Sequence, residues 1–276
     1  MSDLDEARCK ELRKRVFITG YKGGHAHLAS CFSAIEILYT LYMKGILKYD
    51  INNPYLEERD RFVLSKGHSG LALFSVLELA GIISKSEMES YLKCESGIGG
   101  EPNLGDALGI EASTGSLGHG LSMAVGMALA QKNDGKGSRT FVLIGDGECQ
   151  EGTMWEAAMS ASSFSLDNLI VVMDYNKLQK TNRVDETLKY VEWADKWRTF
   201  GWNVLITDGH DVEQLRNVLG EIQMCKKPTI VMAETIKGRG VSIMENSPKW
   251  HFKMPTKKEL KYFIEELGIS EEELEV

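Results

Sequence analysis

Two apolar runs, residues 141–144 and 169–173, are each followed closely by polar residues. The first run leads into Gly145-Asp146-Gly147-Glu148, and the second is followed three residues later by Asn176. The segment between the runs has the length of one helix, which predicts a strand–helix–strand unit with parallel strands. Ligands of such sheets bind at the carboxyl ends of the strands, so we expect Asp146 and Asn176 to face one site.

This pair of side chains suits a magnesium ion. Mg²⁺ takes oxygen ligands in near-octahedral array and is usually held by a few protein groups plus phosphates. Asp146 would supply a charged ligand, Asn176 a neutral one, and the backbone carbonyl of Leu178 a third. Gly147 would let the backbone approach a phosphate, because glycine has no Cβ. Gly-Asp-Gly alone is a common turn, and only the whole combination favours a magnesium–diphosphate site.

Strand-length and helix-length segments alternate along the rest of the chain. We expect strands at 61–64, 141–144, 169–173, 203–207 and 228–233. We expect helices at 4–19, 32–41, 69–80, 87–92, 117–131, 154–163, 192–199 and 212–223. Capping-box spacing at 256–259 and 270–273 predicts two further helix starts. This order predicts an α/β fold with a doubly wound, mainly parallel sheet, formed by residues 1–276 as a single domain.

Composition argues against several other classes of protein. The 276 residues are 43% hydrophobic and 26% charged, as in ordinary globular proteins. A net charge of −8 argues against a nucleic-acid-binding surface. No apolar run approaches the roughly 18 residues of a membrane span, and the charged N-terminus lacks a secretory h-region. Five scattered cysteines without metal spacing suggest reduced thiols, so we expect a cytoplasmic protein.

The sequence resembles the thiamine diphosphate enzymes and, within them, the transketolases. The resemblance is carried by Gly-Asp-Gly with Asn 30 residues after the Asp, and by these further blocks in the family's order: DRFVLSKGH (60–68), EASTGSLGHGLSMAVGMALA (111–130), ADKWRTFGWNV (194–204), DGHD (208–211) and ETIKGRGVSIMEN (234–246). A full transketolase is more than twice this length. The resemblance therefore implies the N-terminal, diphosphate-binding subunit of a split transketolase, which transfers a two-carbon ketol unit using thiamine diphosphate and Mg²⁺.

Three histidines match catalytic positions of the family. In the best ungapped match the family's catalytic histidine is His27, although a second register through His25 is possible. His68, the last residue of a Ser-Lys-Gly-His block, corresponds to a contact with thiamine diphosphate near its reacting carbon. His251 corresponds to a contact with the diphosphate or the donor, but Phe252 stands where the family has glycine.

The resemblance also implies further contacts to the cofactor. The matched residues, besides those already named, are Gly115, Leu117, Gly147, Glu148, Glu151 and Glu156. Gly115 and Leu117 would hold the aminopyrimidine ring. Glu151 and Glu156 match a carboxylate network at the family's subunit contact, although solvated helix charge is the usual fate of glutamate.

One position departs from the family. Transketolases have Gly-His-Pro-Glu where this chain has Gly100-Glu101-Pro102-Asn103. The family's histidine contacts the hydroxyl beside the donor carbonyl. A carboxylate accepts a hydrogen bond from a hydroxyl but donates one only when protonated. Glu101 is thus expected to contact the substrate and to select a specialised ketose or an amino-bearing sugar.

The resemblance implies a partner subunit. The family's glutamate that protonates the aminopyrimidine lies in the pyrimidine-binding domain, and this sequence ends before that domain. We therefore expect a C-terminal transketolase subunit as partner in an α2β2 assembly, with sugar phosphates as substrates. The alternatives are a relative with a specialised sugar or 2-oxo-acid donor, part of a deoxyxylulose-phosphate-synthase-like enzyme, or a non-catalytic cofactor-binding subunit. The intact Asp146, Asn176, His27 and His68 argue against the last.

Overall fold

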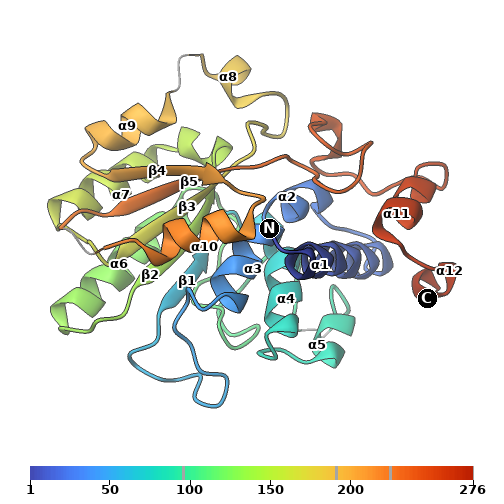
Figure 1. Ribbon diagram of the computed structural model, residues 1–276, viewed down its shortest axis with the longest axis horizontal. Helices are drawn as coiled ribbons and strands as arrows, with labels where there is room; N and C mark the ends of the chain where they lie inside the picture. Colours follow the sequence, from blue (N-terminus) through green and yellow to red (C-terminus); the bar gives the residue numbers. More distant parts are fainter. Residues whose placement is uncertain (95–96, 190–191, 224–225, 276) are drawn as a thin grey trace.

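The computed structural model describes the chain except for residues 95–96, 190–191, 224–225 and 276 (Figure 1). Within the described residues, the centre is a sheet of five parallel strands in the order β1-β2-β3-β5-β4. The strands are β1 Arg61–Leu64, β2 Thr140–Gly145, β3 Leu169–Tyr175, β4 Asn203–Asp208 and β5 Thr229–Glu234. The expected parallel α/β fold is confirmed, and each expected strand is present.

Helices cover both faces of the sheet. One face packs against α1 Asp3–Lys22, α2 Leu28–Ser33, α3 Ile35–Met43, α4 Gly70–Leu79, α5 Lys85–Glu89, α10 Val212–Gly220 and α11 Leu260–Leu267. The other packs against α6 His119–Asn133, α7 Gly152–Ser163 and α9 Trp193–Thr199. The short helices α8 Val184–Thr187 and α12 Glu271–Leu274 complete the described α-helices, and three 3-10 helices lie at Gly67–Ser69, Gly147–Gln150 and Pro248–Trp250. In Figure 1, α3 and α10 lie in front of the sheet.

The strand order explains this division of the helices. The chain crosses in one direction from β1 through β2 and β3 to β4, and then returns from β4 to β5. Because crossovers between parallel strands are right-handed, α6, α7 and α9 lie on one face and α10 lies on the other. Each central strand sends alternate side chains into the two cores. In β2, Phe141 and Leu143 join the first core, whereas Val142 and Ile144 join the second.

The first helix is longer than predicted. It continues to Lys22, three residues beyond its expected end at residue 19. Gly20 is buried, and a Cβ there would lie 2.7 Å from the Cβ of Ala26. This glycine therefore permits close packing inside the helix, and the chain turns only at Gly23, whose N–H donates to the Thr19 carbonyl.

The predicted helix 32–41 is two helices, α2 and α3, which meet at Ala34. The Ser33 hydroxyl donates to the Ser30 carbonyl at 3.2 Å. Such a side-chain bond competes with the backbone bonds of a helix and bends it. The interruption was missed because an isolated serine in an apolar helix gives no clear sign of a break.

Complete or incomplete capping boxes explain where three helices begin. Ser84 heads a complete capping box, so α5 begins two residues before its predicted start. Ser270 heads the expected box before α12. At Thr256 only half of the box forms, because Glu259 accepts the Thr256 N–H but the Thr256 hydroxyl donates to Glu259. The helix α11 therefore begins at residue 260, after the expected start.

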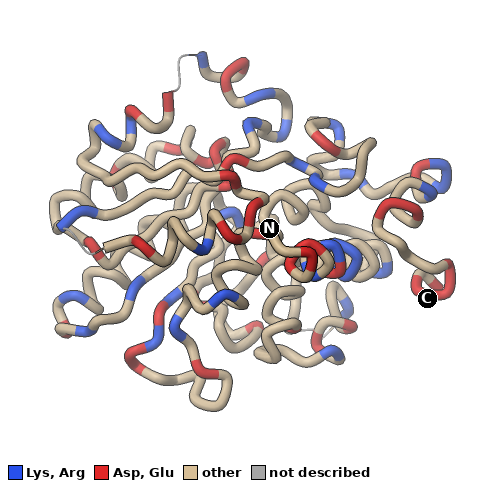
Figure 2. The backbone as a smooth tube through the Cα atoms, in the orientation of Figure 1, with Lys and Arg blue, Asp and Glu red and all other residues tan. Residues whose placement is uncertain are grey.

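Charged residues of both signs lie mainly in the outer helices and loops, and the strands contain few (Figure 2). In the part of the chain that the structure describes, no helix is both long and apolar enough to cross a membrane.

Two glycines of α6 test the packing of this helix on the sheet. A Cβ at Gly120 would lie 2.7 Å from the Cα of Ser65, whereas nothing lies within 4 Å of one at Gly126. We expect Gly120→Ala to lower the free energy of unfolding by about 1–3 kcal/mol through overpacking. The matched control Gly126→Ala should raise it by about 1 kcal/mol, because alanine favours helix. Chemical denaturation measures both, and equal effects would contradict the close contact.

Candidate functional site

The carboxyl ends of β2 and β3 bring two predicted metal ligands together. The Asp146 carboxylate follows β2 and accepts hydrogen bonds from the backbone N–H groups of Gly147, at 2.8 Å, and Lys177, at 2.5 Å. Lys177 is the neighbour of Asn176, whose side-chain oxygen accepts the Leu178 N–H at 3.1 Å. The two loops are thus tied to each other, and Asp146 and Asn176 are both buried.

The third predicted ligand, the Leu178 carbonyl, accepts a hydrogen bond from a lysine side chain. The Lys237 ammonium donates to the Leu178 carbonyl at 3.1 Å. Burial, with the nearby Lys66, lowers the pKa of Lys237 to about 8, while Asp146 and Asp174 act in the opposite direction. A positive charge therefore sits on the carbonyl that would bind a metal, within electrostatic reach of Asp146.

The residues present fit a magnesium ion. Burial, followed by the charge of Asp174, raises the pKa of Asp146 to about 7, although two backbone N–H bonds lower it. Among the described residues, no ammonium or guanidinium lies within ion-pair distance of this carboxylate. A buried carboxylate with an amide oxygen and a carbonyl beside it is a hard-oxygen donor set that a divalent cation would neutralise.

A buried ion pair lies behind these ligands. Lys66 contacts Asp174, and both side chains are almost completely buried. Asp174 also accepts hydrogen bonds from Ser33, Asn176 and Thr235. Burial raises the pKa of Asp174, but Lys66, Thr235 and Ser33 outweigh it and hold the pKa below its usual value. The carboxylate thus stays ionised and orients the amide of Asn176.

Three histidines form a cluster at the same edge. The ring centroids of His27 and His68 are 5.3 Å apart, those of His27 and His251 5.4 Å, and those of His68 and His251 5.6 Å. His27 thus contacts both of the other predicted catalytic histidines. His25, the alternative register, contacts His27 at 5.6 Å and the ring of Phe252 at 4.5 Å.

The clustered histidines are neutral at physiological pH. Burial, then the charges of His25 and Lys237, lowers the pKa of His27 to about 4. Burial and Lys237 lower the pKa of His251 to about 3, and burial lowers that of His68 far below its usual value. A neutral imidazole carries one donor and one acceptor nitrogen. The Lys237 ammonium lies 3.1 Å from His251 Nδ1, so it joins the cluster to the metal ligands.

Glu148 belongs to the scaffold. Its carboxylate accepts hydrogen bonds from the Ser65 hydroxyl and from the N–H groups of Gly118, at 2.8 Å, and Gly145, at 3.2 Å. Burial raises its pKa. Both oxygens accept hydrogen bonds inside the protein, so the Glu148 carboxylate positions the neighbouring backbone, and its contact with the cofactor stays a prediction. It joins the ends of β1 and β2 to the start of α6.

The loop expected to hold the aminopyrimidine lies close to the Ser-Lys-Gly-His block. A Cβ at Gly67 would lie 2.7 Å from the Gly115 nitrogen, so two backbones touch here. Gly115 has a φ of +141°, which favours glycine. Leu117 is half-buried beside it. Only small residues fit this contact.

The carboxylate of Glu101 lies over the same loop. A Cβ at Gly115 would collide with it, and the Thr114 N–H donates to the Pro102 carbonyl at 3.0 Å. Glu101 is exposed. Glu151 and Glu156, by contrast, lie exposed at the start of α7 and do not join the cluster of metal ligands and histidines.

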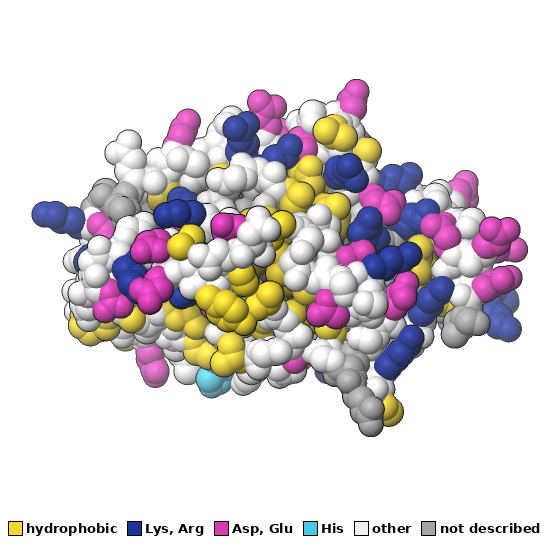
Figure 3. Space-filling view, turned by 90° about the horizontal axis from the view of Figure 1, so that it is seen from below, with side chains coloured by type: hydrophobic (Ala, Val, Ile, Leu, Met, Phe, Trp, Pro, Cys, Tyr) yellow, Lys and Arg dark blue, Asp and Glu magenta, His cyan; other side chains and the backbone are white. Residues whose placement is uncertain are grey.

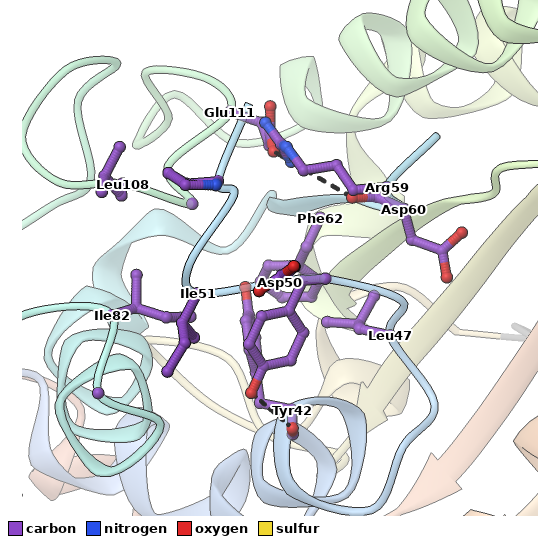
Figure 4. Close-up of a pocket in the computed structure, with 14 residues that line it drawn as sticks. Tyr42, Leu47, Asp50, Ile51, Arg59, Asp60, Phe62, Ile82, Leu108 and Glu111 are labelled. Atoms are coloured by element: carbon purple, nitrogen blue, oxygen red, sulfur yellow. Dashed lines mark hydrogen bonds and ion pairs between the residues drawn. The ribbon is translucent and has the colours of Figure 1, made fainter. Parts of the chain in front are cut away.

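Two cavities differ in their relation to this site. One of about 410 Å³ is lined by Asn176 and Leu178, and so opens beside the predicted metal ligands. The other lies next to the start of β1, where Tyr42 and Phe62 face the ion pair of Arg59 with Glu111 (Figure 4). None of the predicted site residues lines the second cavity.

Three charged residues of the site were not singled out from the sequence. Lys66, Asp174 and Lys237 are buried and connect the metal ligands to the histidines. Each lies inside or beside a block that carries the resemblance. The usable signal was a charge that directly follows an apolar strand, as Asp174 follows 169–173.

Comparison with known proteins identifies relatives. Residues 15–276 match the family model described as "Transketolase, thiamine diphosphate binding domain". The chain is 38% identical over 271 residues to one of the subunits of the apulose-4-phosphate transketolase of Phocaeicola vulgatus, covering 98% of this chain and 96% of that protein. It is 38% identical to the 6-deoxy-6-sulfo-D-fructose transketolase subunit SqwG of a Clostridium species, covering 89% and 90%.

Full-length transketolases match over part of their length. Human transketolase is 37% identical over 245 residues, covering 88% of this chain and 39% of that protein. The crystal structure of transketolase from Campylobacter jejuni superimposes with a TM-score of 0.87 at 27% identity, covering 97% of this chain and 43% of that one. This chain therefore spans about two fifths of these longer proteins.

Asp146→Asn tests the metal site. The substitution keeps the shape but removes the charge, so we expect Mg²⁺-dependent binding of thiamine diphosphate at pH 8 to weaken by more than about 100-fold, as loss of a charged ligand implies. The exposed Asp134→Asn is the matched control and should bind normally. Isothermal titration calorimetry with Mg²⁺ and thiamine diphosphate measures both.

The raised pKa of Asp146 gives the same test a pH dependence. Below about 7 the carboxylate holds a proton that the metal must displace, so Mg²⁺ affinity should fall about tenfold per pH unit. Because the folded pKa exceeds the unfolded one, ionisation of Asp146 should destabilise the metal-free protein as pH rises from about 4 to 7. Asp146→Asn should remove both dependences, and their persistence would contradict the assignment.

Lys66→Met tests the buried pair. It leaves the Asp174 charge buried without its cation, so we expect the free energy of unfolding to fall by about 3–5 kcal/mol. The control is Lys177→Met, which breaks the exposed pair with Glu234 and should cost less than about 1 kcal/mol. Denaturation at pH 7 compares them, and similar losses would show that the Lys66 pair is not structural.

Proposed function

The chain belongs to the transketolase family, and from that premise we propose that it is the diphosphate-binding subunit of a two-subunit transketolase. Its nearly end-to-end match to proteins that are themselves named as transketolase subunits supports this, as does its coverage of only 39% of human transketolase. Residues 1–276 would form one diphosphate-binding domain. With its partner, the chain would transfer a two-carbon ketol unit from a ketose phosphate donor to an aldose acceptor.

Thiamine diphosphate, when bound, supplies the carbanion chemistry that breaks and forms the carbon–carbon bond. The residues of this chain would bind and orient it. Asp146, Asn176 and the Leu178 carbonyl would hold Mg²⁺, and Lys237 would add positive charge beside the diphosphate. Gly115 and Leu117 would border the aminopyrimidine ring.

The cluster of His27, His68 and His251 would handle protons on the substrate oxygens. Each ring is neutral, so each can donate a proton at one nitrogen and accept one at the other. The cluster lies one lysine away from the metal ligands, through Lys237. This juxtaposition is the observation that carries the proposal, because a protein that only bound the cofactor would need no grouped neutral histidines.

A partner subunit with the pyrimidine-binding domain would complete the site, in an α2β2 assembly. Hydrophobic side chains gather across the centre of the face shown in Figure 3, as on surfaces that proteins bury together. The exposed Glu151 and Glu156 would belong to the contact between subunits. We place the enzyme in the cytoplasm, because the described cysteines are free and four in number: Cys9, Cys31, Cys94 and Cys149.

The donor would be a specialised ketose. Two relatives are named for apulose 4-phosphate and for 6-deoxy-6-sulfo-D-fructose, so similar subunits occur in enzymes of uncommon sugars. The carboxylate of Glu101 beside the cofactor loop supports the same proposal, since it offers an acceptor where the family has a histidine.

The proposal is tested by ketol transfer with and without the co-encoded C-terminal subunit, in the presence of Mg²⁺ and thiamine diphosphate. We expect no turnover by the chain alone, and turnover by the pair with at least one donor from a panel of ketose phosphates and 2-oxo acids. Asp146→Asn should abolish activity of the pair, while Asp134→Asn should not. Turnover by the chain alone would contradict the two-subunit proposal. A preference for a 2-oxo acid would show that the donor is a 2-oxo acid and not a ketose.

A further inference from the structure

Three positions that depart from the family pattern or remain unassigned meet at one place. Glu101 replaces a histidine, Phe252 replaces a glycine, and His25 is the histidine left over when His27 takes the catalytic register. The ring of Phe252 lies 4.5 Å from that of His25 and 4.9 Å from that of His27. A Cβ at Gly100, the neighbour of Glu101, would lie 4.0 Å from the His25 ring. These residues come from three loops that are far apart in the sequence.

The imidazole that is lost at position 101 is therefore present nearby, on another loop. His25 lies against the backbone of residue 100 and is half-buried, so part of the residue stays exposed to solvent. Its loop is held in place, because the Tyr91 hydroxyl donates to the His25 carbonyl and the His25 N–H donates to the Gly20 carbonyl. Phe252 packs against the same ring.

Phe252 remains 60% exposed although it packs on two histidines. An exposed aromatic ring at the mouth of a site offers an apolar face that carbon-bound hydrogens of a sugar can cover. The chain thus presents an imidazole, a carboxylate and an aromatic face around the entrance to the catalytic cluster. Together these groups suit a polyhydroxylated ligand, whose hydroxyls need both donors and acceptors.

We propose that His25 is a donor-contacting specificity residue, which supplies the imidazole contact to the hydroxyl beside the donor carbonyl. Glu101 accepts a hydrogen bond from a second hydroxyl, or from an amino group, of the same ketose. Phe252 holds the His25 ring in place. The inference rests on the proposed transketolase function and adds to it the residues that select the donor.

A double-mutant cycle on the two-subunit enzyme tests the exchange of roles. The four proteins are wild type, His25→Ala, Glu101→His and the double variant. We expect His25→Ala to lower kcat/KM for the donor by about tenfold, as loss of one oriented hydrogen bond implies, with the KM of the acceptor unchanged. In the Glu101→His background, His25→Ala should lower kcat/KM for the donor by at most about threefold, which is half of the tenfold loss on a logarithmic scale, because the new imidazole takes over the contact.

Two controls separate a contact role from a structural one. Lys22→Ala changes an exposed residue three positions from His25 and should leave kcat/KM unchanged. His25→Asn keeps a donor and should lose less than His25→Ala, while melting temperatures show that the variants fold.

The outcomes distinguish the two proposals. The role of His25 would be overturned if the wild-type pair is active and His25→Ala leaves kcat/KM for the donor unchanged. It would also be overturned if His25→Ala lowers kcat/KM equally in the wild-type and Glu101→His backgrounds. Either result would leave the transketolase function intact. A wild-type pair that transfers no ketol unit from any donor would overturn both.

Discussion

The contact between the Lys66 ammonium and the Asp174 carboxylate holds the functional edge of the sheet together. Asp174 lies in β3, Lys66 follows β1, and the other donors to this carboxylate come from α2 and from the residue after β5. One buried charge thus fixes the relative positions of four elements. It also accepts a hydrogen bond from the Asn176 amide, so the orientation of this predicted metal ligand is set by a residue behind it.

The same buried cations add to the effect of burial on the histidine cluster. Lys66 and Lys237 contribute to the lowered pKa values of His27, His68 and His251. At the other end, Lys237 contacts the Leu178 carbonyl and lies near Asp146. Lys237 thus lies between the predicted metal ligands and the histidine cluster. A change of charge at the predicted diphosphate site would therefore alter the pKa values of the histidines, in addition to the effect of their burial.

The sequence predicted the strands well because they are short apolar runs that end in polar residues, as β2 and β3 show. Helix boundaries were less accurate where a single contact decides them, as Ser33 does between α2 and α3. Glu148 shows the limit for the site, because its partners Ser65 and Gly118 lie 83 and 30 residues away. Lysines such as Lys66 and Lys237 are expected to be solvated when only the sequence is known, and only tertiary contacts bury these two. The roles of the histidines came from family resemblance, since nothing in their spacing brings residues 27, 68 and 251 together.

The backbone contact between Gly67 and Gly115 has a consequence for how such a site can change. Where two backbones touch there is no side chain that a substitution could enlarge, shrink or recharge. Substitution is easier at the rim, where His25, Glu101 and Phe252 lie on separate loops with exposed surface. Each of these loops can therefore change by itself, while the backbone contact between Gly67 and Gly115 stays the same.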